Sequence, residues 1–518
     1  MDVGQMTSTN GLGTVPAKRL DSWIMEVLQP SEDFRTQVKE TVKQICDFLK
    51  ENCFENNIRV LKTVKGGSAG KGTALRNNSD ADVVLFLNCF SSYQQQKQQR
   101  RHILDLIERR LHACKQSLSF TVNISEPRYK GPGNTPRSLS LTLCSKRTSE
   151  SIEVDILPAY NALGQLRRDA PLNPELYVEA YVGLLNASSG PGEFSPCFTE
   201  LQKKFVKRFP AKLKSLLRLV KYWYKEMLKP QYPTADLPPK YALELLTIYA
   251  WQEGTDSCES FAMAEGFRTV LELLCRYQEI CIYWETCYSL QHSQIGAHIK
   301  SLLRNPRPII LDPADPTGIL GQGKSWDLVA REAARHCSLP CVCAARPWNV
   351  QPARPVTIEV KQLVGTSLSR TISPSTTIWK LKEEIEKTWG IPRYRQRLTL
   401  QDTSGKTLIL QDGEPLASYG IFYSTTLILL HTEPLEMEVF VKDDKNKTTT
   451  YMVLPTDTVR QLKEKIHARQ GPPVDQQRLT YGSRELEDKH TLAYYDVQPR
   501  STLFMLLRLR GGVCPRHP

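Results

Sequence analysis

The sequence predicts an α+β fold with a mixed front part and a repeated tail. Strand and helix patterns alternate up to about residue 198 of the 518, and mostly helical patterns follow up to about residue 350. Two similar units of about 78 residues come last. Strands gathered early and helices later are typical of an α+β core with a second, helical lobe. We therefore expect a core of two lobes, followed by two small domains.

The front part opens with a clear helical pattern. In "DFRTQVKETVKQICDFLKENCF", the apolar residues Phe34, Val38, Val42, Ile45 and Leu49 recur at the spacing of one helix face. "RRHILDLIERRLHAC" predicts another helix. Strands are predicted in "RVLKTV", "DVVLFL", "SLSLTL" and "SIEVDILPAY". In these stretches apolar residues either alternate with polar ones or follow one another directly.

The helical lobe is predicted from Phe198 onward. Its patterns are "LKSLLRLVKYWYKEML", "PKYALELLTIYAWQEG" and "FRTVLELLCRYQEICIYW", the last covering residues 267–284. Pro210 should start a new helix, because proline is tolerated in a first turn. Stretches containing Pro and Gly, such as "NASSGPGEFSP", predict loops between the elements.

The composition changes at "CAARPWNVQPARP", a Pro- and Arg-bearing stretch that predicts a linker. Each repeat after it has two strands, a helix and more short strands. The two helices are "STTIWKLKEEIEKTWGIP" and "TDTVRQLKEKIHARQGPP", and the period is too long for a solenoid. The predicted domains are residues 1–210, 211–350, 355–433 and 435–512.

The composition is that of an ordinary globular protein, with 40% hydrophobic and 24% charged residues. No run of about 18 apolar residues occurs, so we expect no membrane span, and the N-terminus does not match a secretory leader. The fourteen cysteines show no disulfide framework or metal spacing, which favours reduced thiols in the cytoplasm or nucleus. Residues 1–354 carry 45 Lys and Arg against 36 Asp and Glu, which favours a polyanionic partner.

The stretch "KGGSAGKGTALRNNSDADVVLFL" looks like a phosphate-binding glycine loop. A Walker loop would need glycine where Lys65 stands and Ser or Thr where Gly72 stands. A dinucleotide-binding G-x-G-x-x-G pattern would need glycine at Leu75. Both motifs are therefore excluded, and what remains is Gly67 and Ser68 ahead of two aspartates.

Those aspartates, Asp80 and Asp82, enter a predicted strand. Residues two apart in a strand point to the same side, so two carboxylates face one way. Mg²⁺ binds through such carboxylates together with substrate phosphates, and two-metal phosphoryl transfer calls for a further carboxylate nearby. "SIEVDILPAY" offers Glu153 or Asp155, and spacing alone does not choose between them.

Glycine-serine ahead of D-x-D, with a later acidic strand, resembles the nucleotidyltransferase superfamily with a polymerase-β-like core. The motifs "VDILPAYNALG", "LPPKYALELLTIYAWQEG", "RPIILDPADPT" and "WDLVAREA" extend the likeness, so that residues 15–350 resemble the 2′-5′-oligoadenylate synthetases. The resemblance implies a bilobal core activated by double-stranded RNA. It also implies AMP transfer from ATP to the 2′-hydroxyl of an adenylate, release of pyrophosphate, and a place in interferon-induced antiviral innate immunity.

The resemblance also implies the roles of individual residues. The catalytic, metal-binding aspartates would be Asp80, Asp82 and Asp155, holding two Mg²⁺, with Asp155 aiding deprotonation of the attacking hydroxyl. The implied ATP-binding residues are Ser68, Arg218, Lys221, Lys240 and Tyr241. Arg218 and Lys221 stand three apart on one helix, so both can reach one triphosphate. Lys240 departs from the family, which has glutamine there.

For double-stranded RNA, the resemblance implies a cationic surface on the N-terminal helix and on the helices around residue 210. The candidate RNA-binding residues are Lys50, Lys65, Lys203, Lys207 and Lys212. Ala211 stands where the family has threonine, so one polar contact is missing. We expect recognition of A-form shape through phosphates and 2′-hydroxyls.

The second tail unit, residues 437–512, closely resembles ubiquitin, and the first is a more distant copy of the same β-grasp. Ubiquitin's apolar recognition patch maps to Asp444, Thr480 and Leu506, of which two are polar. Two main chain-linking lysines of ubiquitin map to Arg484 and Pro499. We expect that this domain is not recognised as ordinary ubiquitin. "VCPRHP" follows its Gly-Gly, so conjugation would need prior cleavage.

Two functions remain in competition. The first is an active, RNA-stimulated synthetase; the second is a non-catalytic, RNA-binding antiviral adaptor acting through its ubiquitin-like tail. The aspartates of the motif are all present, which favours the enzyme. We expect a cytoplasmic protein, with the nucleus as a second compartment, that binds ATP, RNA and partners of its tail. We also expect a monomer, since "CVC" at residues 341–343 does not match the family's Cys-Phe-Lys oligomerisation motif.

Overall fold

The computed structural model describes residues 11–55, 57–76, 79–114, 122–131, 135–147, 150–165, 173–187, 190, 192–402 and 404–508, with Ser79 and Val122 as backbone. The chain divides into two compact units, Met1–Pro355 and Val356–Pro518.

The front unit contains a mixed sheet in the order β1-β2-β6-β5-β3, with β4 paired to β5. β2 runs parallel to β6, and the other pairs are antiparallel. The strands are β1 (Val60–Gly66), β2 (Ser79–Leu87), β3 (Val122–Ile124), β4 (Arg128–Lys130), β5 (Ser138–Ser145) and β6 (Ser151–Ala159).

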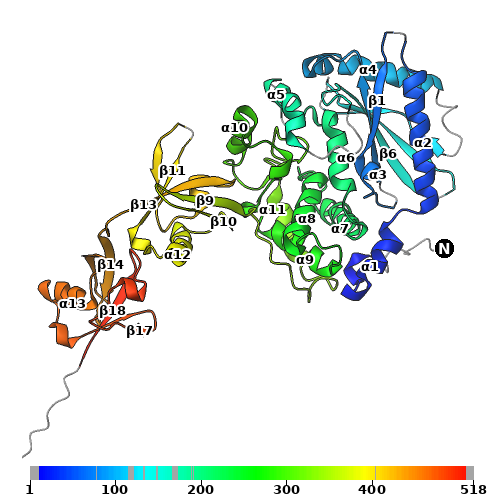
Figure 1. The fold of residues 1–518 in the computed structure, drawn as a ribbon. Helices are drawn as coiled ribbons and strands as arrows, with labels where there is room; N and C mark the ends of the chain where they lie inside the picture. Colours follow the sequence, from blue (N-terminus) through cyan, green and yellow to red (C-terminus); the bar gives the residue numbers. More distant parts are fainter. Residues whose placement is uncertain are drawn as a thin grey trace, which may run out of the picture. The chain divides into compact units, whose positions relative to one another are not determined.

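Two long helices cover the apolar face of this sheet, α2 (Glu32–Glu51) and α4 (Tyr93–Cys114) (Figure 1). Ser31 caps α2 by accepting a hydrogen bond from the Phe34 N–H. The predicted stripe of α2 is confirmed, because its five apolar residues are all buried in one cluster with Val83 and Val154 of the sheet. The residues that alternate with these apolar ones along each strand, among them the two aspartates of β2, therefore project from the opposite face of the sheet.

The rest of the front unit is mainly helical, as predicted. Its helices are α1 (Leu20–Trp23), α3 (Gly67–Lys71), α5 (Val178–Asn186), α6 (Thr199–Lys207), α7 (Ala211–Tyr222), α8 (Lys240–Thr255), α9 (Met263–Cys275), α10 (Ser293–Leu302) and α11 (Trp326–His336). The π-helical turns η3 (Ile24–Leu28) and η7 (Trp223–Leu228) continue α1 and α7. One large apolar cluster joins α1, α7, α8, α9 and α11.

The helix expected over residues 267–284 is shorter than predicted. It ends at Cys275, and β7 (Cys281–Ile282) pairs in parallel with β8 (Ile309–Ile310). Residues 280–284 are all buried. A continuous apolar run of this kind suits a buried strand as well as a helix, so periodicity alone does not separate the two.

The second unit contains two five-stranded sheets with parallel central pairs, which confirms the predicted pair of β-grasp domains. The first has β9 (Val356–Gln362), β10 (Ser367–Ile372), α12 (Ile378–Trp389), β11 (Gln396–Gln401), β12 (Thr407–Ile409) and β13 (Thr425–His431). The second has β14 (Met437–Lys442), β15 (Thr448–Val453), α13 (Val459–Ala468), β16 (Gln477–Tyr481), β17 (Arg484–Glu485) and β18 (Thr502–Leu507). Each domain has its own apolar core.

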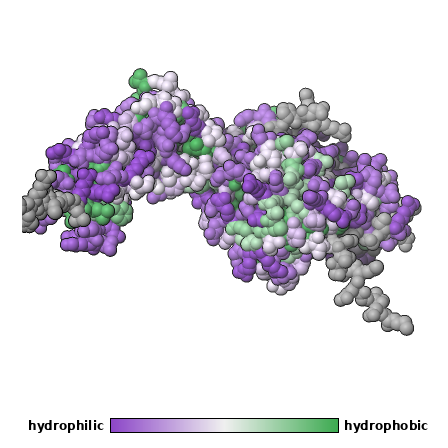
Figure 2. Space-filling view, turned by 90° about the horizontal axis from the view of Figure 1, so that it is seen from below, coloured by the Kyte–Doolittle hydropathy of each residue, from purple (hydrophilic) through white to green (hydrophobic). Residues whose placement is uncertain are grey.

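Figure 2 shows that the visible face of both units is largely hydrophilic, with hydrophobic groups in smaller patches. Within the described residues, no helix is long and apolar enough to cross a membrane.

Candidate active site

The glycine loop forms the short helix α3, which follows β1 directly and packs against β2. Gly67 has φ +67°, and a Cβ there would lie 2.9 Å from the Asp80 carbonyl oxygen and from the Asp82 nitrogen. Glycine is therefore needed for this close approach. The approach brings Ser68 Oγ to 2.5 Å from Oδ1 of Asp80, and Ser68 also accepts the Asp80 N–H at 3.0 Å.

The parallel register of β2 and β6 places Asp80 opposite Glu153 and Asp82 opposite Asp155. All four carboxylates lie on the face away from α2 and α4. Glu153 and Asp155 share Lys130, whose Nζ lies 2.9 Å from Glu153 Oε1 and 3.2 Å from Asp155 Oδ1. Both acids that spacing left open thus lie beside the D-x-D pair, with Asp155 directly across from Asp82.

The two aspartates of β2 have opposite electrostatic surroundings. Burial alone would raise the pKa of Asp80, but Lys240 and Lys221 help to hold that pKa well below its ordinary value. Burial, together with the charges of Asp80 and Asp155, raises the pKa of Asp82 to about 7. Burial and the neighbouring negative charges therefore favour the protonated form of Asp82.

The donor set fits a hard divalent cation in its chemistry. Asp80, Asp82 and Asp155 offer carboxylate oxygens from adjacent strands, which Mg²⁺ prefers. Oδ1 of Asp155 is buried and makes no hydrogen bond, and its near cation is Lys130, with Nζ at 3.2 Å. Among the described residues, no group of three His, Cys, Asp or Glu already has metal-holding geometry. Asp80 instead contacts Ser68, and Asp155 contacts Lys130.

Two predicted ATP-binding cations, Arg218 and Lys221 of α7, hold the segment after α3. Arg218 donates to the carbonyl oxygens of Gly72 at 2.7 Å and Ala74 at 3.0 Å. Lys221 donates to the carbonyl oxygen of Thr73 at 3.0 Å. Both side chains are buried, so they connect the helical part of the unit to the glycine loop.

A buried carboxylate of α8 joins the same network. Glu244 lies 3.1 Å from Lys221 and 3.5 Å from Lys71. Burial would raise the pKa of Glu244, but these lysines lower it below its ordinary value. Lys71 also lies 4.2 Å from the ring centre of Tyr241, whose hydroxyl donates to Asp312 at 3.0 Å. Tyr241 is thus positioned by two contacts.

A cleft of about 480 Å³ lies beside the start of α8, a volume within the range of ligand sites. Asp312 lines it and accepts hydrogen bonds from Tyr241 and Gln202. Burial and Asp315 raise the pKa of Asp312 to about 6. The full lining is Arg137, Gly192, Ser195, Leu237, Pro239, Asp312, Asp315, Gly318, Ile319, Leu320, Gly321 and Lys324.

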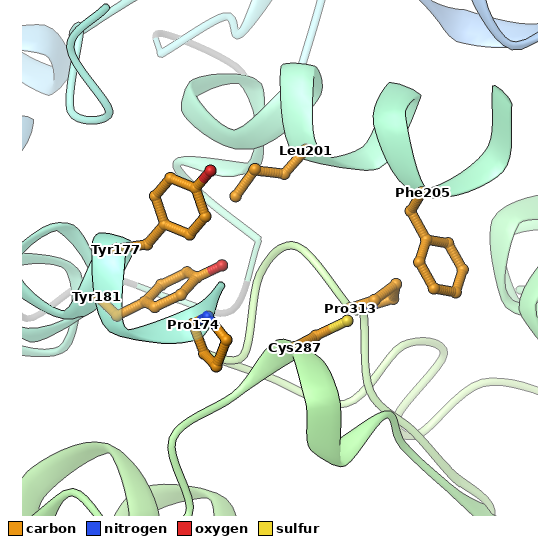
Figure 3. A pocket seen from close by; sticks show the side chains of 7 residues that line it. All are labelled: Pro174, Tyr177, Tyr181, Leu201, Phe205, Cys287 and Pro313. Atoms are coloured by element: carbon orange, nitrogen blue, oxygen red, sulfur yellow. The ribbon is translucent and has the colours of Figure 1, made fainter. Parts of the chain in front are cut away.

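The apolar pocket in Figure 3 is not of nucleotide size, since its volume of about 10 Å³ would hold about one water molecule. Tyr177 and Tyr181 line one side of it, and Phe205 of α6 lies on the other. The remaining lining residues are Pro174, Leu201, Cys287 and Pro313.

Comparison with known proteins shows which families the parts of the chain resemble. Residues 45–131 match the nucleotidyltransferase domain, residues 171–354 match the C-terminal domain 2 of 2′-5′-oligoadenylate synthetase 1, and residues 356–434 and 439–510 match the ubiquitin family. The 2′-5′-oligoadenylate synthase-like protein 2 of Mus musculus is 41% identical over 96% of this chain and 98% of its own length.

The chain belongs to the family of 2′-5′-oligoadenylate synthase-like proteins. The 2′-5′-oligoadenylate synthase-like protein 1 of Rattus norvegicus is 39% identical over 99% of this chain and its own full length. The 2′-5′-oligoadenylate synthase 3 of Mus musculus is 49% identical, over 65% of this chain and 29% of its own length. The predicted family and the α+β fold with two ubiquitin-like domains are therefore confirmed.

Lys225 is a cation of this site that the sequence analysis missed. It lies in η7, next to Lys240 and Asp80, and burial and Lys240 lower its pKa to about 7. A signal was present in the sequence, because Arg218, Lys221 and Lys225 stand at i, i+3 and i+7, the spacing of one helix face. A π-helical turn at this position is typical of functional sites.

The predicted RNA-binding lysines lie on β1 and on the helices α2, α6 and α7. Lys203 lies near Lys65 and Lys207, and burial and these charges lower its pKa. Burial raises the pKa of the Cys46 thiol, and the positive charges of Lys65 and Lys50 partly offset this rise. Lys65 of β1 is therefore close to Lys203 of α6, and both Lys65 and Lys50 are close to Cys46 of α2.

Lys212 is the first lysine of α7. It lies 3.6 Å from Asp21 of α1 and 5.4 Å from the ring centre of Phe261.

In the second ubiquitin-like domain, an apolar residue outside the three mapped positions lies next to them. Thr480 of β16 pairs with Phe504 of β18, and Arg478 pairs with Leu506. Phe504 and Leu506 are each 48% exposed. An aromatic side chain therefore lies beside Thr480, while the Gly511-Gly512 end lies outside the described residues.

Proposed function

We propose that this chain is an RNA-activated 2′-5′-oligoadenylate synthetase, which transfers AMP from ATP to the 2′-hydroxyl of an adenylate and releases pyrophosphate. The observation that carries the proposal is the set of carboxylates, Asp80, Asp82 and Asp155, beside Ser68 and a group of lysines. Nucleotidyl transfer requires carboxylates that bind the metal ions and cations that bind the phosphates.

Each group has a role in this proposal. Asp80, Asp82 and Asp155 would hold Mg²⁺, which supplies Lewis-acid stabilisation of the transferred phosphate. Ser68 would donate its hydroxyl to donor phosphates. Asp155 would accept the proton of the attacking hydroxyl.

The helical side of the site would bind ATP in three ways. Arg218 and Lys221 would keep the glycine loop in place. Lys240 would add positive charge toward the triphosphate, and Tyr241 would line the nucleotide pocket.

Activation by RNA is supported by the position of the lysines. A Cβ on Gly70 of α3 would lie 3.9 Å from Cε of Lys203. Phosphates bound by Lys65, Lys203 and Lys207 would therefore press on the helix that carries Ser68. We propose that RNA acts by setting the geometry between Ser68 and the aspartates, in a monomeric, cytoplasmic antiviral protein.

The test is incubation of the purified full-length chain with ATP, Mg²⁺ and double-stranded RNA, followed by chromatography of the products. We expect 2′-5′-linked oligoadenylates that depend on RNA. Asp82→Ala should lower the rate by at least about 100-fold, the scale of losing a key electrostatic group. Absence of product from the unsubstituted chain, or equal product from Asp82→Ala, would refute the activity.

A second function, an RNA-binding adaptor, is favoured by the tail. Phe504 and Leu506 are exposed side by side on β18, where a partner could bury them. RNA binding without product in the same assay would support the adaptor over the enzyme, and the two roles are compatible in one chain.

A further inference from the structure

The loop after β8 carries a buried carboxylate, Asp312, within the stretch "RPIILDPADPT". The residue is 3% exposed. Its Oδ1 accepts from the Tyr241 hydroxyl at 3.0 Å and from the Ala314 N–H at 2.9 Å, and its Oδ2 accepts from Nε2 of Gln202 at 2.7 Å. Both carboxylate oxygens therefore have donors, and the two side-chain donors come from different helices.

These two donors belong to different sides of the proposed site. Tyr241 lies in the first turn of α8, where it would line the nucleotide pocket. Gln202 lies in α6, directly before Lys203 and in the same helix as Lys207, the lysines proposed to bind RNA. One carboxylate thus connects the nucleotide side of the unit to the helix of the proposed RNA surface.

The loop around Asp312 is also packed against α6 by apolar contacts. Leu201 and Phe205 of α6 line the small pocket of Figure 3 together with Pro313, the residue after Asp312. The hydroxyl of Tyr288 donates to the carbonyl oxygen of Asp312. Because close-packed interiors transmit displacement, a shift of α6 would move the carboxylate with it.

The chemistry of the contact links the carboxylate to the tyrosine. A carboxylate accepts hydrogen bonds, whereas the phenol hydroxyl and the amide nitrogen donate them. A buried donor that loses its acceptor is left with the full cost of its desolvation. The Tyr241 hydroxyl is therefore stabilised where the Asp312 carboxylate lies, and the orientation of the Tyr241 ring depends on that position.

We propose that Asp312 is a positioning residue that joins Tyr241 of the nucleotide site to helix α6, so that RNA bound at α6 changes the affinity for nucleotide. The inference deepens the proposed function and rests on it for the roles of Tyr241 and of the α6 lysines. Asp312 acts through Tyr241 in this role. Since coupling between two binding sites is reciprocal, bound nucleotide changes the affinity for RNA by the same factor.

The test measures binding of an ATP analogue to the full-length chain by calorimetry, in Mg²⁺ at about pH 8. The analogue has a methylene group between the α- and β-phosphorus atoms, so the measurement requires no turnover. Burial and Asp315 raise the pKa of Asp312 to about 6, so its carboxylate is ionised under these conditions. Saturating double-stranded RNA should lower the Kd at least about 5-fold, the lower end of ordinary coupling. An unchanged Kd would overturn the proposal.

Two variants each remove one hydrogen bond of Asp312. Tyr241→Phe and Gln202→Leu approximately keep the size of the side chain but cannot donate to the carboxylate. Each should reduce the effect of RNA on the Kd to less than about twofold. The matched control is Tyr232→Phe, which removes a hydroxyl that donates to the buried carboxylate of Glu332 at 3.1 Å. This control should keep the full effect of RNA.

An exchange of donor and acceptor distinguishes this contact from a general loss of structure. Asp312→Asn combined with Gln202→Glu reverses the hydrogen bond, since the new amide nitrogen donates to the new carboxylate while the amide oxygen still accepts from Tyr241. This double variant should keep most of the effect of RNA. If Tyr241→Phe or Gln202→Leu keeps the full effect, or the exchanged pair loses it as Gln202→Leu does, the positioning role is overturned.

Oligoadenylate synthesis by the same samples separates this role from the enzymatic activity. An effect of RNA on the Kd that depends on the contacts of Asp312, in a chain that makes no product, supports the positioning role and refutes the enzyme. Product from a chain whose variants all keep the full effect of RNA refutes the positioning role alone.

Discussion

The buried ion pairs of Glu244 lend themselves to a quantitative test. The Glu244 side chain is 9% exposed, and its partners Lys221 and Lys71 are 2% and 11% exposed. The substitution Glu244→Gln preserves the size of the side chain and removes its charge. Two lysines would then lie buried without the carboxylate that they share.

Removing one partner of a buried ion pair costs about 3–5 kcal/mol. We expect the lower end, about 3 kcal/mol, because glutamine still accepts hydrogen bonds and Asp80 also acts near Lys221. For the unit Met1–Pro355, an unfolding entropy of about 2.1 cal/mol/K per residue converts this loss into a fall of about 4 °C in Tm.

The assay is differential scanning calorimetry of the full chain, with the tail transition as an internal reference. Glu253→Gln changes an exposed glutamate of the same helix and should alter stability by less than about 0.5 kcal/mol. Adding Lys71→Met to Glu244→Gln should recover part of the loss, because one uncompensated charge is removed. A Tm for Glu244→Gln within 1 °C of the Glu253→Gln control would refute this account of the network.

Three further outcomes follow from the same structure. Gly67→Ala would force a Cβ to within 2.9 Å of β2 at φ +67°, so activity should fall and the unfolding free energy should drop by about 1–3 kcal/mol in denaturant titration; unchanged values would contradict the close approach. Lys203→Glu with Lys207→Glu should weaken RNA activation and flatten its dependence on salt in the oligoadenylate assay, and intact activation would remove this face from the proposal. His336 accepts a hydrogen bond from Trp223 at 2.9 Å, and burial lowers its pKa below the ordinary 6.5. The contribution of the neutral ring to stability is complete when the pH is above the ordinary pKa. This contribution is lost as the pH falls through the lower pKa that the ring has in the folded protein. Tm between pH 7.5 and 5 should therefore fall more in the unsubstituted chain than in His336→Gln, and parallel curves would contradict this.

Much of the fold could be predicted because local patterns report burial directly. The stripe from Phe34 to Leu49 and the alternation through Ile152, Val154 and Ile156 are buried as expected. The internal repeat, and the likeness of its second copy to ubiquitin, predicted the two β-grasp domains of the tail. The helix expected over 267–284 was too long, because the apolar residues 280–284 follow one another without the spacing that distinguishes a helix from a strand.

Of the candidate site, the sequence indicated the residue types but not their partners. Arg218 and Lys221 were expected to face phosphates. In the structure they donate hydrogen bonds to backbone carbonyl oxygens of residues 72–74. Lys225 was passed over, since its importance depends on Lys240, which approaches from another helix. Phe504 was missed because its neighbour Thr480 lies across a strand pair.

The sequence by itself determined the fold class, the tandem tail, the family and the D-x-D strand, because these are written in spacing and motif over short stretches. Only the tertiary structure decided that Asp155 lies opposite Asp82 while Glu153 lies opposite Asp80, that Glu244 is shared by two lysines, and that Lys225 meets Lys240. Those contacts join segments that are distant along the chain. They depend on strand register and on how helices pack, which are set by the burial of the whole core rather than by any local pattern.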